Sequence, residues 1–345
     1  QPTTSFQPPQ PLSLKPIGDC LMNSVSPFRF VIIGSGNISR TYLRAAAQLP
    51  DVRVAGVVSR SGRRSEGLPA EAAVFPSLAA VNVPFDAVIL TTPNGLHHQG
   101  AIEAAALGKH VLTEKVLEIS LDAMDRMTRA CRDAGVKLAV TYQRRMSPDN
   151  KAVKRLLDAD QLGRVFAADM TVKFWRDDAY YKSGAYRGTR GVDGGGAFTQ
   201  QASHNADLLC WFFGMPKRVV SLCDTFLHDI EVEDHGVALL HYPNGMIGTF
   251  TASTACKPGF PTRLEIHAAA GSLVMENDCI TQWHIAGLPN PAEKKFQVHD
   301  GASSAAVTDT AGHEAIIRDA AIRDGMKTLA EDGWRLVRLG VTTRA

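Results

Sequence analysis

Long hydrophobic runs are missing from this sequence, because no apolar stretch approaches the ~20 residues that a membrane-spanning helix needs. A charge excess is also missing: 37 basic and 35 acidic side chains give a net charge of +2, without a cluster of lysine or arginine. The balance argues against nucleic acid and against an anionic membrane as partners. We therefore expect a chain that binds neither.

Closely spaced cysteines are the next absence. The six cysteines lie far apart, with no C-x-x-C pair: Cys20, Cys131, Cys210, Cys223, Cys256 and Cys279. A zinc site or a disulfide framework needs closer, paired spacing, so we expect reduced thiols and no bound metal. Residues 1–27 are rich in Pro, Ser and Gln and lack a signal-peptide core, which predicts a disordered leader on a cytoplasmic protein.

An alternation of strands and helices begins after this leader. An apolar run at residues 30–33 leads into the glycine-rich turn GSGNIS (34–39), followed by a predicted helix at about 40–48 and a predicted strand at 52–58. A strand, a glycine-rich turn, a helix and a second strand within about 30 residues are typical of a dinucleotide-binding domain.

Each glycine of this turn has a physical task. Gly34 permits the tight turn, and Gly36 lets backbone N–H groups approach a pyrophosphate at the helix N-terminus. Ser39 occupies the third position, where glycine or alanine is usual. We expect the cofactor to contact Gly34, Ser35, Gly36, Asn37 and Ile38.

The end of the second strand bears on the choice of cofactor. Ser59 and Arg60 stand where an NAD-specific site usually has an acidic residue for the ribose 2′-hydroxyl. A serine and an arginine suit a 2′-phosphate, because guanidinium binds phosphate through charge-assisted hydrogen bonds. The alternative is a solvated basic loop, so the sequence predicts NAD or NADP with a preference for NADP.

Further strands continue the pattern at 87–92, 110–113 and 136–142, with helices at 101–107 and 121–134 between them. Ligands of doubly wound sheets lie beyond the carboxyl ends of the strands. The residues that follow two of these strands are therefore further candidates for the cofactor site: Thr92, Pro93, Asn94, His97, Glu114 and Lys115. The whole pattern predicts a Rossmann domain at residues 28–146 within an α/β plus α+β chain.

The pattern changes in the second half. A predicted helix at 148–159 is followed by a series of predicted strands at 164–175, 218–226, 233–242, 246–255, 262–269 and 272–276. Pro243-Asn244-Gly245 is a hairpin signal. Successive strands without helices between them predict an open, mostly antiparallel sheet, covered by helices on one face, in a substrate-binding and oligomerisation domain at 147–345. A further helix is expected at 312–330.

A glycine triplet at 194–196 precedes a predicted helix that contains a histidine among apolar residues. We expect Gln200 and His204, four residues apart, to share one face of this helix, with Asp207 three residues further on. A histidine in such surroundings is more often a buried core residue than a functional one. The residues alone leave both interpretations open.

Four motifs in order, GSGNIS, TTPNGLHH, GKHVLTEK and GGGAFTQQASHNADLLCWFFG, resemble the glucose–fructose oxidoreductase / inositol dehydrogenase / MocA (Gfo/Idh/MocA) family over residues 28–284. The resemblance implies an NAD(P)-dependent oxidoreductase in which Lys115 and His204 are catalytic. Two positions depart from the family pattern: Val116 replaces a proline, and Gln200 replaces an aspartate found in many members. Gln201 and the aromatic stretch at 174–189 are similar to the nucleotide-sugar branch.

The predicted reaction is hydride transfer between nicotinamide and a secondary hydroxyl or ketone of a sugar, nucleotide sugar or cyclic polyol. The substrate is expected to contact Gln143, Trp175, Tyr181, Arg187, Gln200, Gln201 and Asp207. Two alternatives remain open: a non-catalytic dinucleotide-binding regulator of the same fold, and a dehydrogenase of a diol or other small molecule. The exposed sheet face further predicts a homodimer or homotetramer.

Overall fold

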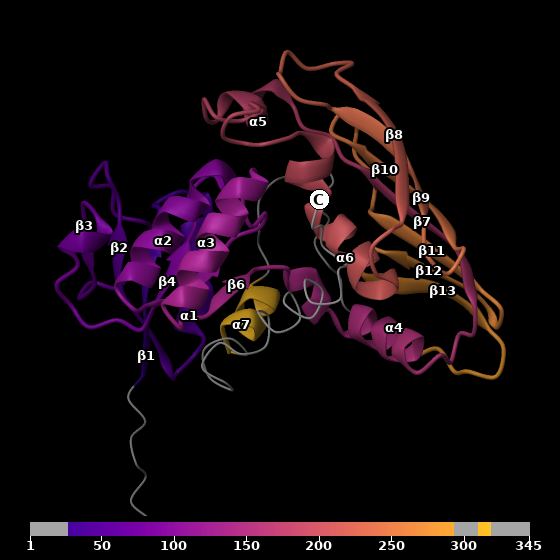
Figure 1. Ribbon diagram of the computed structural model, residues 1–345, viewed down its shortest axis with the longest axis horizontal. Helices are drawn as coiled ribbons and strands as arrows, with labels where there is room; N and C mark the ends of the chain where they lie inside the picture. Colours follow the sequence, from indigo (N-terminus) through magenta and orange to yellow (C-terminus); the bar gives the residue numbers. More distant parts are fainter. Residues whose placement is uncertain (1–26, 293–309, 319–345) are drawn as a thin grey trace, which may run out of the picture.

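The computed structural model describes residues 27–292 and 310–318, and Figure 1 shows two domains side by side. The leader expected at 1–27 lies outside this part of the chain except for its last residue. The helix expected at 312–330 is described only as far as α7 (Ala311–Arg318). No described helix has the length and apolar character that crossing a membrane would require.

The first domain is a six-stranded parallel sheet. Its strands are β1 (Phe28–Ile33), β2 (Val52–Val58), β3 (Ala73–Phe75), β4 (Ala87–Leu90), β5 (His110–Thr113) and β6 (Leu138–Val140). Their spatial order, β3-β2-β1-β4-β5-β6, is the doubly wound order of a Rossmann fold. The central strand β4 is apolar and buried throughout because both faces of a parallel sheet are covered. The structure confirms the predicted α/β domain.

The helices of this domain are α1 (Asn37–Ala47), α2 (His97–Ala106) and α3 (Leu121–Asp133), with short 3₁₀ turns at Leu78–Ala80 and Asn94–Leu96. Two of them begin earlier than the sequence predicts, α1 at residue 37 rather than 40 and α2 at residue 97 rather than 101. The short strand β3 was not predicted, since three residues give too little periodicity.

The second domain is built on a seven-stranded sheet, ordered β13-β12-β11-β7-β10-β9-β8. Its strands are β7 (Val165–Lys173), β8 (Arg218–Asp224), β9 (His235–His241), β10 (Ile247–Ser253), β11 (Arg263–Ala268), β12 (Gly271–Glu276) and β13 (Cys279–Ile285). Every pair is antiparallel except β7 with β10. The predicted hairpin joins β9 to β10, and β13 was not predicted.

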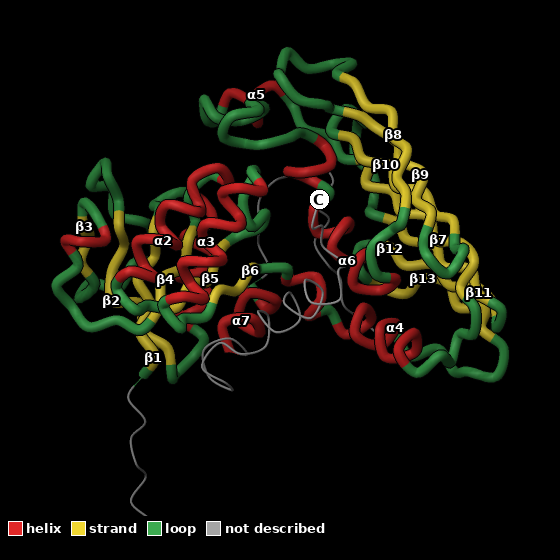
Figure 2. The backbone as a smooth tube through the Cα atoms, viewed as in Figure 1, coloured by secondary structure: helices red, strands yellow, loops and turns green. Residues whose placement is uncertain are grey.

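Helices lie on one face of this sheet only (Figures 1 and 2). They are α4 (Pro148–Asp158), the π-helical turn Ala197–Gln201 and α6 (Ser203–Phe213). The 3₁₀ turn Gln143–Met146 precedes α4, and α5 (Asp178–Lys182) lies away from the sheet, beyond its end (Figure 1). Leu208, Leu209 and Phe212 of α6 pack into the core over the sheet. The predicted boundary between residues 146 and 147 lies between the 3₁₀ turn and α4.

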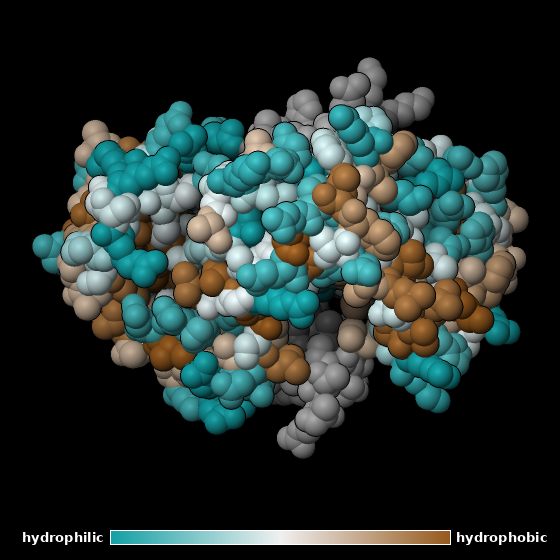
Figure 3. Space-filling model, turned by 90° about the horizontal axis from the view of Figure 1, so that it is seen from above, coloured by the Kyte–Doolittle hydropathy of each residue, from teal (hydrophilic) through white to brown (hydrophobic). Residues whose placement is uncertain are grey.

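The opposite sheet face exposes apolar side chains. In β9 the exposed and buried residues alternate, so that Val237 and Leu239 face outward. On neighbouring strands Leu222 is 83% exposed and Ile247 is 61% exposed. Brown side chains gather over this half of the molecule in Figure 3.

The two domains are joined by hydrogen bonds at the edge where the site lies. Gly95 N donates to Val192 O at 2.9 Å, and Asn94 Nδ2 donates to Asp193 O at 3.0 Å. A Cβ at Gly95 would lie 3.2 Å from Val192 O and 2.8 Å from an Ile119 methyl, so a side chain here would have to displace both. The loop after β4 is thereby fixed on the loop that precedes the glycine triplet.

Candidate active site

The turn after β1 is shaped for a phosphate group. Gly34 has φ +114°, and a Cβ there would lie 2.7 Å from Thr91 Oγ1 and 2.9 Å from Thr91 O. Gly36 has open space where its Cβ would stand. The first turn of α1 contains no acidic residue, and no side chain caps its N–H groups. These unpaired N–H groups and the helix dipole fit the pyrophosphate of a dinucleotide.

Ser39 occupies the third position of the glycine-rich turn, where glycine or alanine is usual. The side chain is fully buried, and its hydroxyl donates to Gly36 O at 2.6 Å and contacts Ser65 Oγ at 3.0 Å. The serine therefore closes the turn through hydrogen bonds. Asn37 and Ile38 begin α1 beside it.

The β2 end is polar and basic. Ser59 is buried, and its hydroxyl lies 2.9 Å from Ser35 Oγ, so the two serines connect this strand end to the glycine turn. Arg60 is exposed beside them. No acidic residue occurs from 59 to 65, and Glu66 is paired with Arg40.

His97 is not placed to bind a cofactor through its ring nitrogens. It is fully buried, with Nδ1 2.9 Å from Val116 O and Nε2 3.0 Å from Thr92 O. The ring therefore connects the loop after β4 to the loop after β5. Thr92 Oγ1, in contrast, is buried without a partner in the described structure, as a group awaiting a ligand would be. Pro93 lies just before the 3₁₀ turn that begins at Asn94.

Lys115 follows β5 and reaches across to the second domain, where Nζ donates to Gln200 O at 2.8 Å. Burial lowers the pKa of Lys115. The negative charges of Glu114 and Asp193 oppose this fall, and the positive charges of Arg144 and Arg176 add to it. The peptide bond from Lys115 to Val116 is cis.

Glu114 faces inward rather than toward a cofactor. Its carboxylate accepts a hydrogen bond from Tyr42 at 2.7 Å and lies 3.6 Å from His313 Nε2 of α7. Burial raises the pKa of Glu114, but the nearby His313, the hydrogen bond from Tyr42 and the charge of Lys115 leave it below its usual value. A buried carboxylate therefore stands directly behind Lys115.

His204 is the second candidate catalytic group. Its ring meets Tyr142 edge to face at 5.9 Å, and Nδ1 is buried without a partner in the described structure. Burial, and then the positive charges of Lys115 and Arg144, hold the pKa of His204 well below its ordinary value. The imidazole is therefore neutral near pH 7 and lies within the field of the lysine. Trp211 stacks on Phe212 instead of on His204.

The prediction that Gln200 and His204 share one α-helical face is wrong. Gln200 belongs to the π-helical turn Ala197–Gln201, and α6 begins only at Ser203. The cause is Glu233, whose carboxylate accepts the N–H groups of Gly196 and Phe198 at 3.0–3.1 Å. A Cβ at Gly196 would lie 1.7 Å from Glu233 O, so the glycine is required for this contact.

A small pocket lies beyond Gln200. Its lining comes from α5, the π-helical turn and neighbouring loops: Tyr180, Tyr181, Gly188, Asp193, Gly195, Gly196, Gln200, Gln201, Val232 and Thr254. Gln201 Oε1 accepts from Arg176 at 2.8 and 3.1 Å, and Gln201 Nε2 donates to the Tyr180 hydroxyl at 2.7 Å. Arg187 lies over the Tyr180 ring, with its guanidinium carbon 4.3 Å from the ring centroid.

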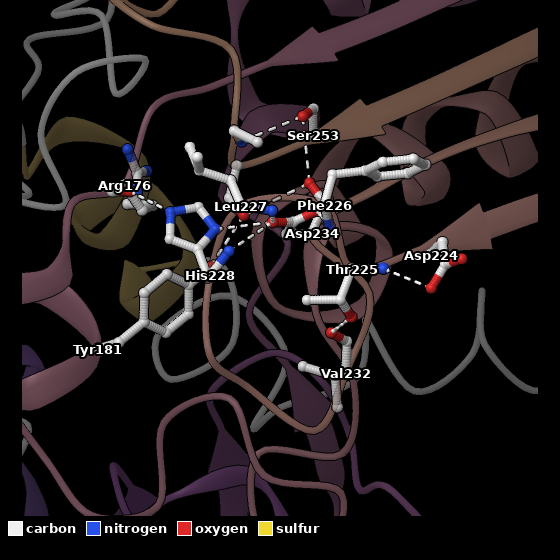
Figure 4. A network of polar contacts seen from close by, with 12 residues as sticks. Arg176, Tyr181, Asp224, Thr225, Phe226, Leu227, His228, Val232, Asp234 and Ser253 are labelled. Carbon is white, nitrogen blue, oxygen red and sulfur yellow. Dashed lines mark hydrogen bonds and ion pairs between the residues drawn. The ribbon is translucent and has the colours of Figure 1, made fainter.

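A network of polar contacts around His228 and Asp234 includes two residues of the pocket lining, Tyr181 and Val232 (Figure 4). His228 lies between Asp234 Oδ2 at 2.9 Å and Arg176 O at 2.8 Å. Asp234 also accepts the N–H groups of residues 226, 227 and 228. Tyr181 packs on His228 at 4.8 Å and bonds Thr254 Oγ1 at 2.8 Å.

The remaining predicted substrate residues lie apart from this pocket. Both carboxylate oxygens of Asp207 are bound by Arg145, at 2.5 and 2.7 Å. Trp175 packs on His228 and beneath Lys257. Gln143 packs against Gly312, and its buried Oε1 has no partner in the described structure.

Sequence reasoning omitted five residues that the structure places at the site: Tyr142, Arg144, Arg176, Tyr180 and Asp193. Two signals were available. Arg176 and Tyr180 lie within the aromatic stretch already noted, and Asp193 immediately precedes the glycine triplet. Among the residues described, no group of three or more His, Cys, Asp or Glu could hold a metal ion.

Two family models match the chain. Residues 28–142 match "Oxidoreductase family, NAD-binding Rossmann fold", and residues 150–274 match "GFO/IDH/MocA C-terminal domain". The 1,5-anhydro-D-fructose reductase of Ensifer adhaerens is 27% identical over 256 residues, covering 72% of this chain and 76% of the relative.

Two solved structures are also similar. The WlbA dehydrogenase of Bordetella pertussis, in complex with NADH and UDP-GlcNAcA, is 31% identical, with a TM-score of 0.72 and coverage of 77% of this chain and 79% of that one. The WlbA dehydrogenase of Chromobacterium violaceum, with the same ligands, is 25% identical, with a TM-score of 0.76 and 92% of both chains covered. The chain belongs to the Gfo/Idh/MocA family of NAD(P)-dependent oxidoreductases.

Proposed function

We propose that this oxidoreductase transfers hydride between a nicotinamide cofactor and a secondary hydroxyl on the sugar ring of a nucleotide sugar, with Lys115 and His204 as its catalytic residues. One observation supports it most: a neutral histidine with an unpartnered Nδ1 lies in the field of the lysine ammonium that reaches across from the first domain to Gln200 O. Lys115 and His204 are far apart in the sequence and belong to different domains, so no contact between sequence neighbours accounts for their proximity.

The two side chains have complementary chemistry. In the oxidation direction, neutral His204 accepts the hydroxyl proton. The Lys115 ammonium uses one N–H on Gln200 O, and its remaining N–H groups are available to stabilise negative charge on the substrate oxygen. The nicotinamide, when bound, supplies the hydride acceptor. We expect Gly34–Ile38 to hold the pyrophosphate, and Thr92 and Asn94 to lie on the nicotinamide side.

The nucleotide-sugar assignment has two supports. Both WlbA structures contain UDP-GlcNAcA, and the chain covers 92% of one of them. Tyr180, Tyr181 and Gln201 lie around Gln200, and the Arg187 guanidinium stacks on the Tyr180 ring. Aromatic rings, amides and a guanidinium are groups that suit a polar ring bearing an acid or phosphate. A free sugar or cyclic polyol is the second candidate, favoured by the similarity to 1,5-anhydro-D-fructose reductase.

Turnover tests the function directly. We expect cofactor absorbance to change when the enzyme is mixed with NAD or NADP and one of a panel of nucleotide sugars, free sugars and polyols. The matched control is the double variant Lys115→Met/His204→Asn, which keeps the dinucleotide turn. Dinucleotide binding without turnover on any panel member would favour the alternative of a non-catalytic regulator.

We further propose that NADP is the preferred cofactor, because Arg60 is exposed beside Ser59 and no carboxylate is available there. Arg60→Glu should weaken NADP binding by roughly tenfold, about 1.4 kcal/mol, and leave NAD binding unchanged or stronger. Calorimetry with both dinucleotides measures this. The proposal fails if the wild-type protein binds NAD more tightly than NADP.

We also propose that a second copy of the chain covers the exposed sheet face. Leu222, Leu239 and Ile247 form part of an apolar surface that a monomer would leave in water. A homodimer or homotetramer follows from this proposal, and the cytoplasmic location expected from the sequence stays a prediction.

A further inference from the structure

Asp193 is a buried acidic residue to which neither the sequence nor the reaction above gives a role. It is 2% exposed and immediately precedes the glycine triplet. Its Oδ1 accepts a hydrogen bond from Gln200 Nε2, its Oδ2 accepts one from Gly188 N at 2.9 Å, and its carbonyl accepts one from Asn94 Nδ2 at 3.0 Å. One residue therefore connects three segments around the pocket.

Gln200 connects Asp193 to Lys115. The side-chain amide of Gln200 is held by Asp193, and the backbone carbonyl of the same residue accepts the Lys115 ammonium at 2.8 Å. Because the π-helical turn is fixed at its far end by Glu233, the anchor on Asp193 determines where this carbonyl points. Asp193 thus acts on Lys115 through position.

It also acts through charge. Lys115 is surrounded by two carboxylates, Glu114 and Asp193, and by two guanidinium groups, those of Arg144 and Arg176. Burial lowers the pKa of Lys115, and the Asp193 charge opposes this fall. Burial in turn raises the pKa of Asp193, and its hydrogen bonds and neighbouring positive charges offset only part of this rise. Water is scarce around such groups, so their mutual attraction is stronger than at a surface.

We propose that Asp193 is a positioning residue for Lys115. It holds the π-helical turn so that the Gln200 carbonyl accepts the hydrogen bond from Lys115, and it keeps the lysine in its ammonium form. Gln200 cannot ionise, and the negative charge comes from a residue seven positions earlier in the chain. The proposal deepens the function proposed above and rests on it for its consequence in turnover. Its test does not depend on turnover.

The experiment measures the reactivity of Lys115 in the full chain. Acetic anhydride modifies the free amine but not the ammonium, and peptide mass spectrometry reports the extent at each pH. In Asp193→Asn we expect the midpoint of Lys115 acetylation to move to lower pH. An adjacent opposite charge typically displaces a pKa by about 1–3 units, so labelling below the midpoint should be roughly tenfold faster.

Asp234→Asn is the matched control. Asp234 is a buried aspartate of the same domain that accepts backbone N–H groups and bonds His228 instead of Gln200. This variant should leave the acetylation midpoint of Lys115 unchanged. A general loosening of the domain would move the midpoint in both variants, and that result would overturn the proposal.

Gln200→Met provides a second test if Asp193→Asn does not fold. This variant leaves the carboxylate and its bond to Gly188 in place but removes the anchor of the turn, so Lys115 should be acetylated faster at a fixed pH. An unchanged rate would overturn the positioning role.

Turnover distinguishes the two proposals. If the wild-type enzyme is active, the loss of kcat at alkaline pH, where Lys115 loses its proton, should begin at lower pH in Asp193→Asn. A midpoint that does not move in an active enzyme refutes the role of Asp193 and leaves the proposed function standing. A moved midpoint in a chain that turns over no substrate supports Asp193 and refutes the proposed function.

Discussion

Replacing Lys115 by methionine tests the proposed catalytic pair most directly. Methionine is unbranched, like lysine, but lacks the ammonium that donates to Gln200 O at 2.8 Å. A positioned acid–base group contributes typically about 10²–10⁴-fold to the rate. We therefore expect kcat to fall by this factor, which corresponds to about 2.7–5.4 kcal/mol of transition-state stabilisation. Dinucleotide affinity should hardly change, because the pyrophosphate turn lies at the start of α1.

The same variant should alter the pH dependence of the residual activity. Oxidation needs neutral His204, so kcat rises with pH through the pKa of that residue. In the wild type, burial first and the Lys115 charge second place this pKa well below its ordinary value of 6.5. Methionine removes the charge but not the burial. The acidic limb of the profile should therefore move to higher pH and remain below pH 6.5.

The assay is a pH–rate profile of kcat in the oxidation direction, combined with calorimetry of dinucleotide binding. Lys154→Met is the matched control: Lys154 forms an i,i+4 pair with Asp158 on α4, away from the pocket, and such pairs contribute at most about 0.5 kcal/mol. Wild-type kcat in Lys115→Met, or an acidic limb that stays in place, would refute the reasoning.

Three further perturbations follow from the geometry. Gly34→Ala brings a Cβ to 2.7 Å from Thr91 Oγ1 at a position with positive φ. We expect calorimetry to show that this variant no longer binds the dinucleotide. Gly62→Ala, at a position with positive φ but open space around the Cβ, should still bind it. Arg145→Met leaves the buried Asp207 carboxylate uncompensated and should lower the free energy of unfolding by about 3–5 kcal/mol in urea titrations, with recovery when Asp207→Asn is added. Leu222→Glu should reduce the mass measured by light scattering to that of a monomer, whereas Leu121→Glu, equally apolar and 69% exposed on α3, should not.

Local pattern was sufficient for most of the fold. The apolar runs around 30–33 and 110–113 and the glycines at 34 and 36 predicted a Rossmann domain, because its first unit is built from contacts close in sequence. The order of helix-free strands after residue 164 predicted an open, mostly antiparallel sheet. The strands β3 and β13 were missed, since neither has enough periodicity to stand apart from a loop.

The candidate site was only partly accessible to this reasoning. The resemblance to a family singled out Lys115 and His204, but the sequence alone could not tell a functional histidine from a core histidine. Periodicity predicted a continuous helix through Gln200, whereas Glu233, more than 30 residues away, holds that segment as a π-helical turn. Hydrogen-bond partners distant in sequence override local preference in this segment.

The sequence by itself determined the doubly wound domain, the glycine turn for the pyrophosphate and the change of architecture in the second half, since each depends on residues within one or two elements. Only the tertiary structure decided three features of the site. Lys115 donates to the carbonyl of Gln200, Asp193 accepts from the side chain of Gln200, and burial keeps His204 neutral. Charge and solvation depend on what surrounds a group from every direction, and those neighbours are assembled only when the two domains come together.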